Sequence, residues 1–180
     1  LARANHFVFD KTGTLTHGRM HLEELQVLGD RDEAQLVRLA AAIEQGSEHP
    51  VAAGLRAASA GQALPTASDV QAETGLGMRG IVDGETFWIG RPDYVARAAG
   101  LASPAGLEEL ASRGGTVIGL AARSGWLGLF RLADPLRDEA AVLSGRLAAE
   151  GVGMSVLSGD APTVVASVAG ALGIRDAQGG

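Results

Sequence analysis

Asp10 is the side chain in this sequence that is best placed to do chemistry. It follows a short apolar run, residues 6–9, that predicts a buried strand, and it precedes a Thr-Gly-Thr turn at residues 12–14. A carboxylate at the C-terminal end of a strand, facing a glycine turn, can accept a phosphoryl group among backbone N–H donors. An aspartate that only caps the turn is the alternative interpretation, and for a single aspartate it is the commoner one.

A second polar element, Ser158-Gly159-Asp160, stands between a predicted strand at residues 152–157 and a predicted helix at residues 162–172. A hydroxyl beside the free N–H groups of a helix N-terminus can hold phosphate oxygens. Serine and aspartate are also common N-cap residues, so the residues alone leave both interpretations open.

The elements that would position these groups fall into three blocks. The two ends of the chain show the strand–helix–strand–helix alternation of an α/β layer. The middle has an amphipathic helix at residues 33–43 and, further on, short strands joined by glycine turns, which predict hairpins and hence an antiparallel sheet. We therefore predict an α/β domain from residues 1–19 and 126–180, with an α+β domain, residues 20–125, inserted into it.

Composition narrows the classes of partner. The net charge is −6 and the only lysine is Lys11, so a nucleic-acid-binding surface is not expected. The absence of cysteine excludes disulfides and thiolate metal sites within the chain. No apolar run reaches the ~20 residues that span a membrane, and no signal peptide is evident, so a soluble chain is expected.

Residues 10–16, Asp-Lys-Thr-Gly-Thr-Leu-Thr, match the phosphorylation motif of P-type ATPases without a mismatch. The resemblance implies a haloacid-dehalogenase-like, Rossmann-type phosphorylation domain, incomplete here, that carries an inserted nucleotide-binding domain. It implies catalytic roles for Asp10, Lys11 and Thr12, with Asp10 as the residue that is phosphorylated. It also implies that Asp10 and the carbonyl of Thr12 bind Mg²⁺.

Two further elements resemble the same family. Ser158-Gly159-Asp160 is similar to its Thr-Gly-Asp element, with serine in place of threonine and Ala161 in place of the usual asparagine. Asp134 and Arg137 are similar to its Asp-x-x-Arg element at the hinge between the two domains. The resemblance implies that the serine–glycine–aspartate element and Asp134 belong to the catalytic site.

The insert carries the most specific signal for one branch of the family. Residues 47–50, Ser-Glu-His-Pro, resemble the signature of the nucleotide-binding domain in heavy-metal-transporting P-type ATPases. The resemblance implies that His49 orients ATP and that Glu44, five residues earlier, helps to bind adenine.

Three glycines complete the expected nucleotide site. Gly75 and Gly77 resemble the glycine pair on which the nucleotide packs, and a residue without a side chain leaves a ligand room to approach. Gly90 resembles a further glycine of the family pattern, although Arg91 follows it where asparagine is usual.

Taken as a whole, the resemblance implies the cytoplasmic part of an integral membrane pump that uses ATP and Mg²⁺ to transport a heavy-metal cation, copper first and zinc or cadmium next. Its partners would be ATP and the pump's own actuator domain and membrane helices, which the sequence lacks. The family's later lysine and its Gly-Asp-Gly-x-Asn-Asp loop are also missing, and the parallel sheet is expected to stop after Ile174. We therefore expect a fragment that binds nucleotide without turning it over.

Two other functions remain open. A free-standing phosphatase of the same superfamily carries a second acid two residues after the nucleophile, where this sequence has Thr12. Without that acid an aspartyl phosphate lacks a ready base to activate water, which favours a pump. A non-catalytic nucleotide sensor would keep Glu44 and His49 and tolerate the loss of Asp10, which this chain retains.

Overall fold

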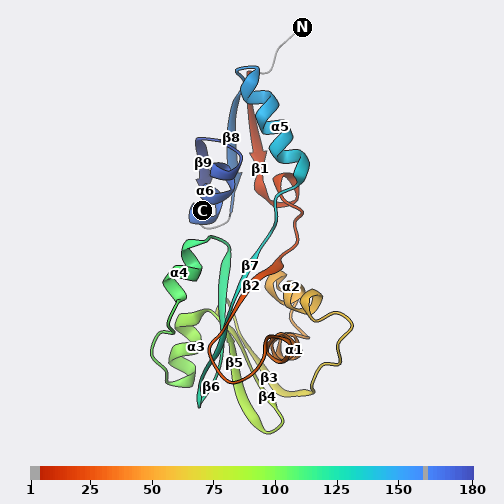
Figure 1. Ribbon diagram of the computed structural model, residues 1–180, viewed down its shortest axis with the longest axis vertical. Coiled ribbons are helices and arrows are strands. Elements are labelled where there is room, and N and C mark those ends of the chain that lie inside the picture. Colours follow the sequence, from red (N-terminus) through yellow and green to blue (C-terminus); the bar gives the residue numbers. More distant parts are fainter. Residues whose placement is uncertain (1–4, 160–161) are drawn as a thin grey trace. The chain divides into compact units, whose positions relative to one another are not determined.

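The computed structural model describes residues 5–159 and 162–180, and the chain folds as two compact units (Figure 1). One unit combines the two ends of the chain, up to Arg19 and from Asp134 onward. The other unit is the insert, Met20–Ala133.

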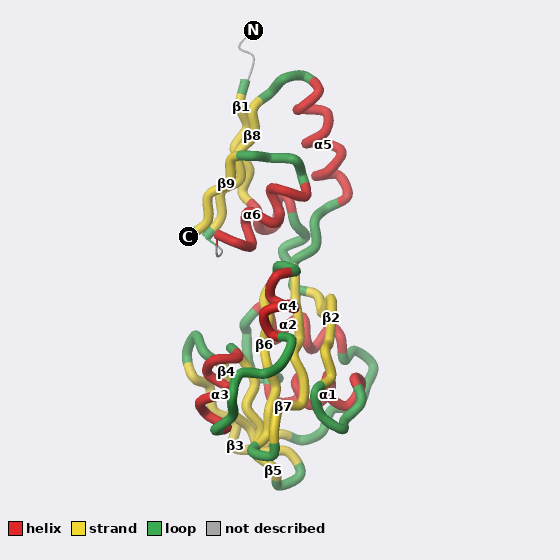
Figure 2. Tube along the Cα trace, turned by 60° about the vertical axis from the view of Figure 1, so that its left-hand side comes forward, coloured by secondary structure: helices red, strands yellow, loops and turns green. Residues whose placement is uncertain are grey.

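The unit that combines the chain ends is a parallel sheet with two helices. Its regular elements are β1 (His6–Asp10), α5 (Asp138–Ala149), β8 (Gly153–Ser158), α6 (Pro162–Ala171) and β9 (Asp176–Gly179). The strands lie in the order β1-β8-β9, and α5 and α6 lie on the same face of the sheet (Figure 2). Parallel strands are usually joined by such crossover helices, because the chain must run back to the end of the sheet where the previous strand began before the next strand can start. The α/β architecture predicted for the chain ends is confirmed.

The third strand, β9, corrects the prediction that the sheet stops after Ile174. Its residues pair in parallel with β8, with Asp176 opposite Ser155. The segment Asp-Ala-Gln-Gly has neither β-branched residues nor apolar alternation, so its own propensity does not predict a strand. Pairing with β8, and the burial of Leu172 and Ile174 just before it, hold it in place.

The insert is built on the antiparallel sheet that the hairpin pattern predicted. The six strands lie in the order β2-β7-β6-β5-β4-β3. They are β2 (His21–Val27), β3 (Ala67–Glu73), β4 (Gly77–Val82), β5 (Glu85–Gly90), β6 (Thr116–Ala122) and β7 (Gly125–Ala133). The helices are α1 (Glu33–Ile43), α2 (Pro50–Ala58), α3 (Pro92–Ala99) and α4 (Leu107–Ser112).

Both faces of this sheet are covered. On β5, Phe87 and Ile89 join the core that α1 and α2 close, whereas Trp88 packs with Tyr94 and Val95 of α3. Successive side chains of a strand point to opposite faces, so this alternation places α1 and α2 on one side of the sheet and α3 on the other.

The end of the insert differs from the prediction. We predicted a return to the α/β domain at residue 126, but β7 pairs along its length with β6 and with β2. Residues 126–133 therefore belong to the inserted sheet, because their backbone hydrogen bonds are made there, and the α/β unit resumes at Asp134.

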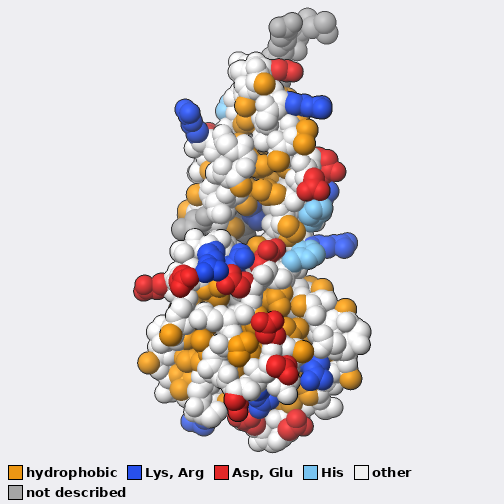
Figure 3. Space-filling view, viewed as in Figure 1, with side chains coloured by type: hydrophobic (Ala, Val, Ile, Leu, Met, Phe, Trp, Pro, Cys, Tyr) orange, Lys and Arg blue, Asp and Glu red, His pale blue; other side chains and the backbone are white. Residues whose placement is uncertain are grey.

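The surface carries charges of both signs. On the face that Figure 3 shows, acidic and basic side chains are interspersed. In the part of the chain that the structure describes, no helix combines the length and the apolar character that crossing a membrane would require.

Candidate active site

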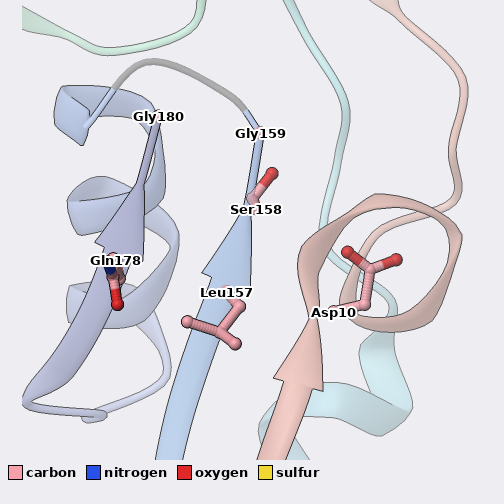
Figure 4. A pocket seen from close by; sticks show the side chains of 6 residues that line it. All are labelled: Asp10, Leu157, Ser158, Gly159, Gln178 and Gly180. Carbon is pink, nitrogen blue, oxygen red and sulfur yellow. The ribbon is translucent and has the colours of Figure 1, made fainter.

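Asp10 ends β1 and lines a pocket at the C-terminal edge of the parallel sheet (Figure 4). The pocket has a volume of about 390 Å³, the size of a small-ligand site. Asp10 pairs in register with Leu157 of β8, so Ser158 follows one residue past the level of the carboxylate. Figure 4 shows the Ser158 hydroxyl and the Asp10 carboxylate pointing beyond the ends of their strands. The lining residues are Asp10, Leu157, Ser158, Gly159, Gln178 and Gly180.

The turn that follows Asp10 (η1, Lys11–Leu15) is not a regular helix. Thr12 is extended, with φ −79° and ψ 120°, and Gly13 has a left-handed φ of 79°, which glycine adopts without steric cost. The chain therefore bends back directly after Asp10 and leaves Thr12 exposed in the turn. Lys11 is buried, with 4% of its surface exposed, so its side chain is enclosed by the unit.

Asp134 anchors the segment that comes after this turn. The buried hydroxyl of Thr16 donates to Asp134 Oδ2 at 2.6 Å, and the backbone N–H groups of Gly18 and Arg19 donate to the same carboxylate at 3.1 Å each. The Thr16 hydroxyl also lies 3.0 Å from the Lys11 carbonyl, but its single proton goes to the nearer, charged oxygen. Three donors on one carboxylate fix the path of the chain where it leaves the α/β unit.

Arg137 secures the same segment from the other side. Its Nε donates to the Thr16 carbonyl at 3.0 Å, and its Nη2 donates to the Gly13 carbonyl at 3.1 Å. Its backbone N–H donates to the Leu15 carbonyl at 2.9 Å. Asp134 and Arg137, three residues apart, thus hold the turn that carries Asp10 and Thr12 in one conformation.

In the insert, Glu44 is the most unusual ionisable group. It follows the last residue of α1, and only 6% of its surface is exposed. Burial raises the pKa of this carboxyl, although a hydrogen bond from Ser47 and the charges of His49 and Arg56 oppose the increase. A carboxyl whose pKa is perturbed by burial and by a specific charged neighbour is a candidate for a functional site.

His49 is the N-cap residue of α2. Its Nδ1 accepts a hydrogen bond from the backbone N–H of Val51 at 3.2 Å. Because Nδ1 is the acceptor, a neutral imidazole carries its proton on Nε2. Its ring is exposed, so the structure leaves Nε2–H available as a donor to a ligand.

The local backbone favours glycine at all three positions predicted for the nucleotide site, and the reason differs between Gly75 and the other two. Gly75 lies in the turn before β4 and has a φ of 73°, which favours glycine. Gly77 and Gly90 are paired across β4 and β5, and a Cβ on either would meet the backbone of the other strand within 2.5 Å. Helix α1 runs along β4, where Ile43 packs over Gly80. Glu44 and Gly77 are therefore on neighbouring elements.

A sequence model of the haloacid dehalogenase-like hydrolases matches residues 4–178, nearly the whole chain. The chain belongs to this family. In this chain Asp10 ends β1, the first strand of the parallel sheet.

Curated relatives confirm the similarity to heavy-metal-transporting P-type ATPases that the motifs indicated. The chain is 42% identical over 177 residues to the probable copper-transporting ATPase SynA of Synechococcus elongatus, which covers 97% of this chain and 22% of the relative. It is 36% identical over 181 residues to the probable copper-exporting P-type ATPase V of Mycobacterium tuberculosis, covering 93% and 22%. It is 37% identical over 179 residues to the zinc/cadmium/lead-transporting P-type ATPase of Escherichia coli, covering 97% and 24%. The chain thus spans less than a quarter of the length of these proteins.

Two solved structures of zinc-transporting P-type ATPases match the chain over nearly its whole length. A crystal structure of a zinc-transporting PIB-type ATPase in the E2.Pi state matches with a TM-score of 0.82 and 34% identity, over 99% of this chain and 29% of that chain. A second crystal structure of a zinc-transporting PIB-type ATPase matches with a TM-score of 0.78 and 37% identity, over the same shares.

The residues around Asp10 fit a site for Mg²⁺ that has few protein ligands. Mg²⁺ prefers carboxylate, carbonyl and water oxygens, and usually binds through one or two carboxylates plus substrate phosphates. The Asp10 carboxylate and the Thr12 carbonyl are donors of this kind. Within residues 5–159 and 162–180 there is no group of three or more histidine or acidic side chains that could hold a metal ion. Asp160, which we predicted as part of the catalytic site, lies outside the described residues.

Two contacts in the candidate sites could not be predicted from the sequence. In the sequence Thr16 is only the last residue of the phosphorylation motif, yet its hydroxyl donates a hydrogen bond to Asp134. Arg56 was not singled out at all, yet it contacts the segment between Glu44 and His49. Asp134 lies 118 residues after Thr16, and Arg56 contacts backbone carbonyls. Neither kind of contact leaves a signal in the residue pattern.

Proposed function

We propose that this chain is the ATP-binding and phosphorylated region of a P-type ATPase that uses ATP hydrolysis to transport a heavy-metal cation across a membrane, with copper as the cation. The observation that carries the proposal is Asp10 at the end of a parallel strand, in a pocket with Ser158 and followed by Thr12 instead of an acid. The similarity to copper- and zinc-transporting P-type ATPases supports it over most of the chain.

In the proposed reaction Asp10 is the nucleophile. One carboxylate oxygen forms a bond to the γ-phosphorus of ATP while the bond from that phosphorus to the β,γ-bridging oxygen breaks, so ADP leaves and an aspartyl phosphate remains. The Ser158 hydroxyl, which lines the same pocket as Asp10, would donate to an oxygen of the transferred group. A bound Mg²⁺ would neutralise charge on the phosphates, which a chain of net charge −6 does not do by general attraction.

The turn after Asp10 suits an intermediate that persists. Thr12 occupies the position where a related phosphatase has its general acid and base, and a threonine hydroxyl does not activate water efficiently. Arg137 and Asp134 hold the turn in place, so the substitution cannot be compensated by a simple shift of the backbone. These features favour a pump over a free-standing phosphatase.

The insert would bind the nucleotide. Glu44, when ionised, can accept a hydrogen bond from the adenine amino group, and His49 Nε2–H can donate to the nucleotide. Isothermal titration of the whole chain with ATP tests this site. Glu44→Ala and His49→Gln are each expected to weaken binding several-fold, because each loss leaves a polar group unpaired. Glu33→Ala, an exposed acid at the start of the same helix, is the control. Unchanged affinity in both site variants would exclude the proposed nucleotide site.

The identity of the cation needs a separate measurement in cells. Disruption of the gene that encodes this chain is expected to change cellular copper content and leave zinc and cadmium content unchanged. A change in zinc or cadmium without a change in copper would overturn copper as the cation, and the phosphorylation chemistry would stand.

A further inference from the structure

The segment between α1 and α2 carries both side chains of the proposed adenine site. Glu44 lies at its start, where α1 ends, and His49 lies at its end, as the N-cap of α2. The residues between them include Gly46, and Gln45, Gly46 and Glu48 are exposed. A short exposed segment with a glycine has many accessible conformations, so something must hold Glu44 and His49 at a fixed separation.

Arg56 makes the contacts that do this. Its Nη1 donates to the Glu44 carbonyl and to the Ser47 carbonyl, both at 2.8 Å. One Nη atom carries two N–H groups, so a single guanidinium nitrogen can make both bonds. The backbone N–H of Ser47 also donates to the Glu44 carbonyl at 3.1 Å, which closes a tight turn around the arginine.

The position of Arg56 could also be explained by its place in the helix. It lies in the last turn of α2, where a basic side chain interacts favourably with the helix dipole. That effect does not account for the direction of its Nη1 bonds, which run back to the segment that precedes α2. The charge of Arg56 also acts on the Glu44 carboxylate, where it opposes the effect of burial on the pKa.

We propose that Arg56 is a positioning residue of the nucleotide site, which holds the α1–α2 segment in the conformation that presents Glu44 and His49 to an adenine nucleotide. The inference rests on the proposed function. When Arg56 is lost, the segment must be ordered at the moment of binding, and the cost of that ordering lowers affinity.

A positioning role predicts the same loss for every adenine nucleotide. Arg56 acts on the segment that would bind the base, so its removal should weaken ATP, ADP and AMP by one common factor. A residue that contacted the phosphates directly would lower affinity more for ATP than for AMP, because charge-assisted bonds scale with the charge of the ligand.

The test is calorimetric titration of the whole chain with ATP, ADP and AMP. Arg56→Leu is expected to weaken all three about five- to twentyfold, the range of one or two lost hydrogen bonds. Arg56→Lys keeps the charge and a single donor group, so an intermediate loss is expected. Arg97→Leu is the matched control, because Arg97 is an exposed arginine in the last turn of α3, and it should bind like the wild type.

Hydrogen exchange without nucleotide provides a second readout. In Arg56→Leu the amides of residues 45–48 should exchange faster, while those in the middle of α1 keep their wild-type rates. Should Arg56→Leu fail to fold, Arg56→Gln replaces it in both measurements, with the same expected directions.

Three results would overturn the proposal. Wild-type affinity and exchange in Arg56→Leu would remove any role for Arg56 and leave the nucleotide site intact. A loss that grows from AMP to ATP would make Arg56 a phosphate contact. A wild-type chain that binds none of the three nucleotides would overturn both this inference and the proposed nucleotide site.

Discussion

Gly77 and Gly90 face each other across β4 and β5, and neither has room for a Cβ. A Cβ on Gly77 would lie 2.2 Å from the Ile89 carbonyl and 2.9 Å from the Tyr94 ring, and one on Gly90 would lie 2.5 Å from the Gly77 Cα. Contacts this short require the backbone to move. From the sequence we interpreted Gly77 as room for a ligand and Gly90 as a further glycine of the family pattern; the contacts show that the pairing of the two strands requires both glycines.

Gly77→Ala and Gly90→Ala are therefore expected to lower the stability of the insert whether or not nucleotide is bound. Overpacking of this kind costs about 1–3 kcal/mol, and Gly90 adds strain because its φ is 143°. Chemical unfolding of the whole chain measures the loss. Gly46→Ala is the control, since nothing lies within 4 Å of its Cβ position. Wild-type stability in Gly77→Ala would show that the strand pair can separate without cost.

The bond between Thr16 and Asp134 gives a second prediction. Thr16→Val keeps the shape of a fully buried side chain but removes the donor to Asp134. The loss is expected to destabilise the α/β unit by about 1.5–3 kcal/mol, the range for losing a hydrogen bond to a charged group, while the N–H groups of Gly18 and Arg19 still donate to Asp134. Thr16→Ser keeps the hydroxyl and should retain most of the stability.

The control for this prediction is Thr14→Val, in the same turn and exposed. Urea unfolding of the three variants decides the outcome. Equal stability of Thr16→Val and Thr14→Val would mean that the backbone N–H groups of Gly18 and Arg19 suffice to hold Asp134.

Glu44 links stability to pH in a direction opposite to that of a salt-bridged acid. Its pKa in the folded chain is raised above the ordinary value of 4.5, with burial as the largest cause. The folded chain therefore holds this proton more tightly than the unfolded chain does. The contribution to stability is fully present below the ordinary value and is lost as pH rises through the raised pKa of Glu44.

Glu44→Gln should therefore melt at a higher temperature than the wild type at pH 8, because the amide needs no ionisation in a buried place. The difference should shrink toward pH 4, where the wild-type carboxyl is protonated. The same variant should bind ATP more weakly, because an ionised acceptor has been lost. Glu33→Gln, exposed on the same helix, should change neither property. A lower melting temperature for Glu44→Gln at pH 8 would show that Arg56 and His49 outweigh burial.

Elements that depend on local sequence signals, such as apolar spacing and helix caps, could be predicted from the sequence. Helix α1 has the bounds that we predicted, because its apolar spacing is regular and Asp32 and Gln35 form a capping box at its start. Burial on α5 does not follow from its apolar residues alone, because Leu143 is 44% exposed while Ala140 and Ser144 are buried.

What the sequence did not predict depends on tertiary partners. Strand β9 forms because β8 has a free edge with which it can pair. The insert ends at Ala133, and not before residue 126 as predicted, because β7 pairs with β2, the first strand of the insert. For the site, the motifs supplied Asp10, Ser158, Glu44 and His49 as predictions. The contacts around Asp10 join residues far apart in the chain, 118 positions for Thr16 and Asp134, and no local pattern encodes such a pair.

The last prediction concerns the chain's own reactivity. We expect the 180-residue chain to bind ATP without steady-state hydrolysis and with little stable phosphate on Asp10. The resemblance implies that the intact family adds a later lysine and an acidic loop beside the phosphate, and the only lysine here, Lys11, is 4% exposed. Removing such an electrostatic partner commonly lowers a rate by ~10²–10³.

Incubation with radiolabelled ATP and Mg²⁺, followed by acid quench, measures the acyl phosphate directly. The wild type and Asp10→Asn are expected to give the same weak signal, while titration shows that both still bind ATP. The proposed nucleotide site lies in the insert and Asp10 lies in the other unit, so binding and phosphorylation can fail independently. Strong labelling that disappears in Asp10→Asn would show that Asp10, Thr12 and Ser158 suffice for phosphoryl transfer. The lysine and the acidic loop would then have some other role, such as hydrolysis of the aspartyl phosphate.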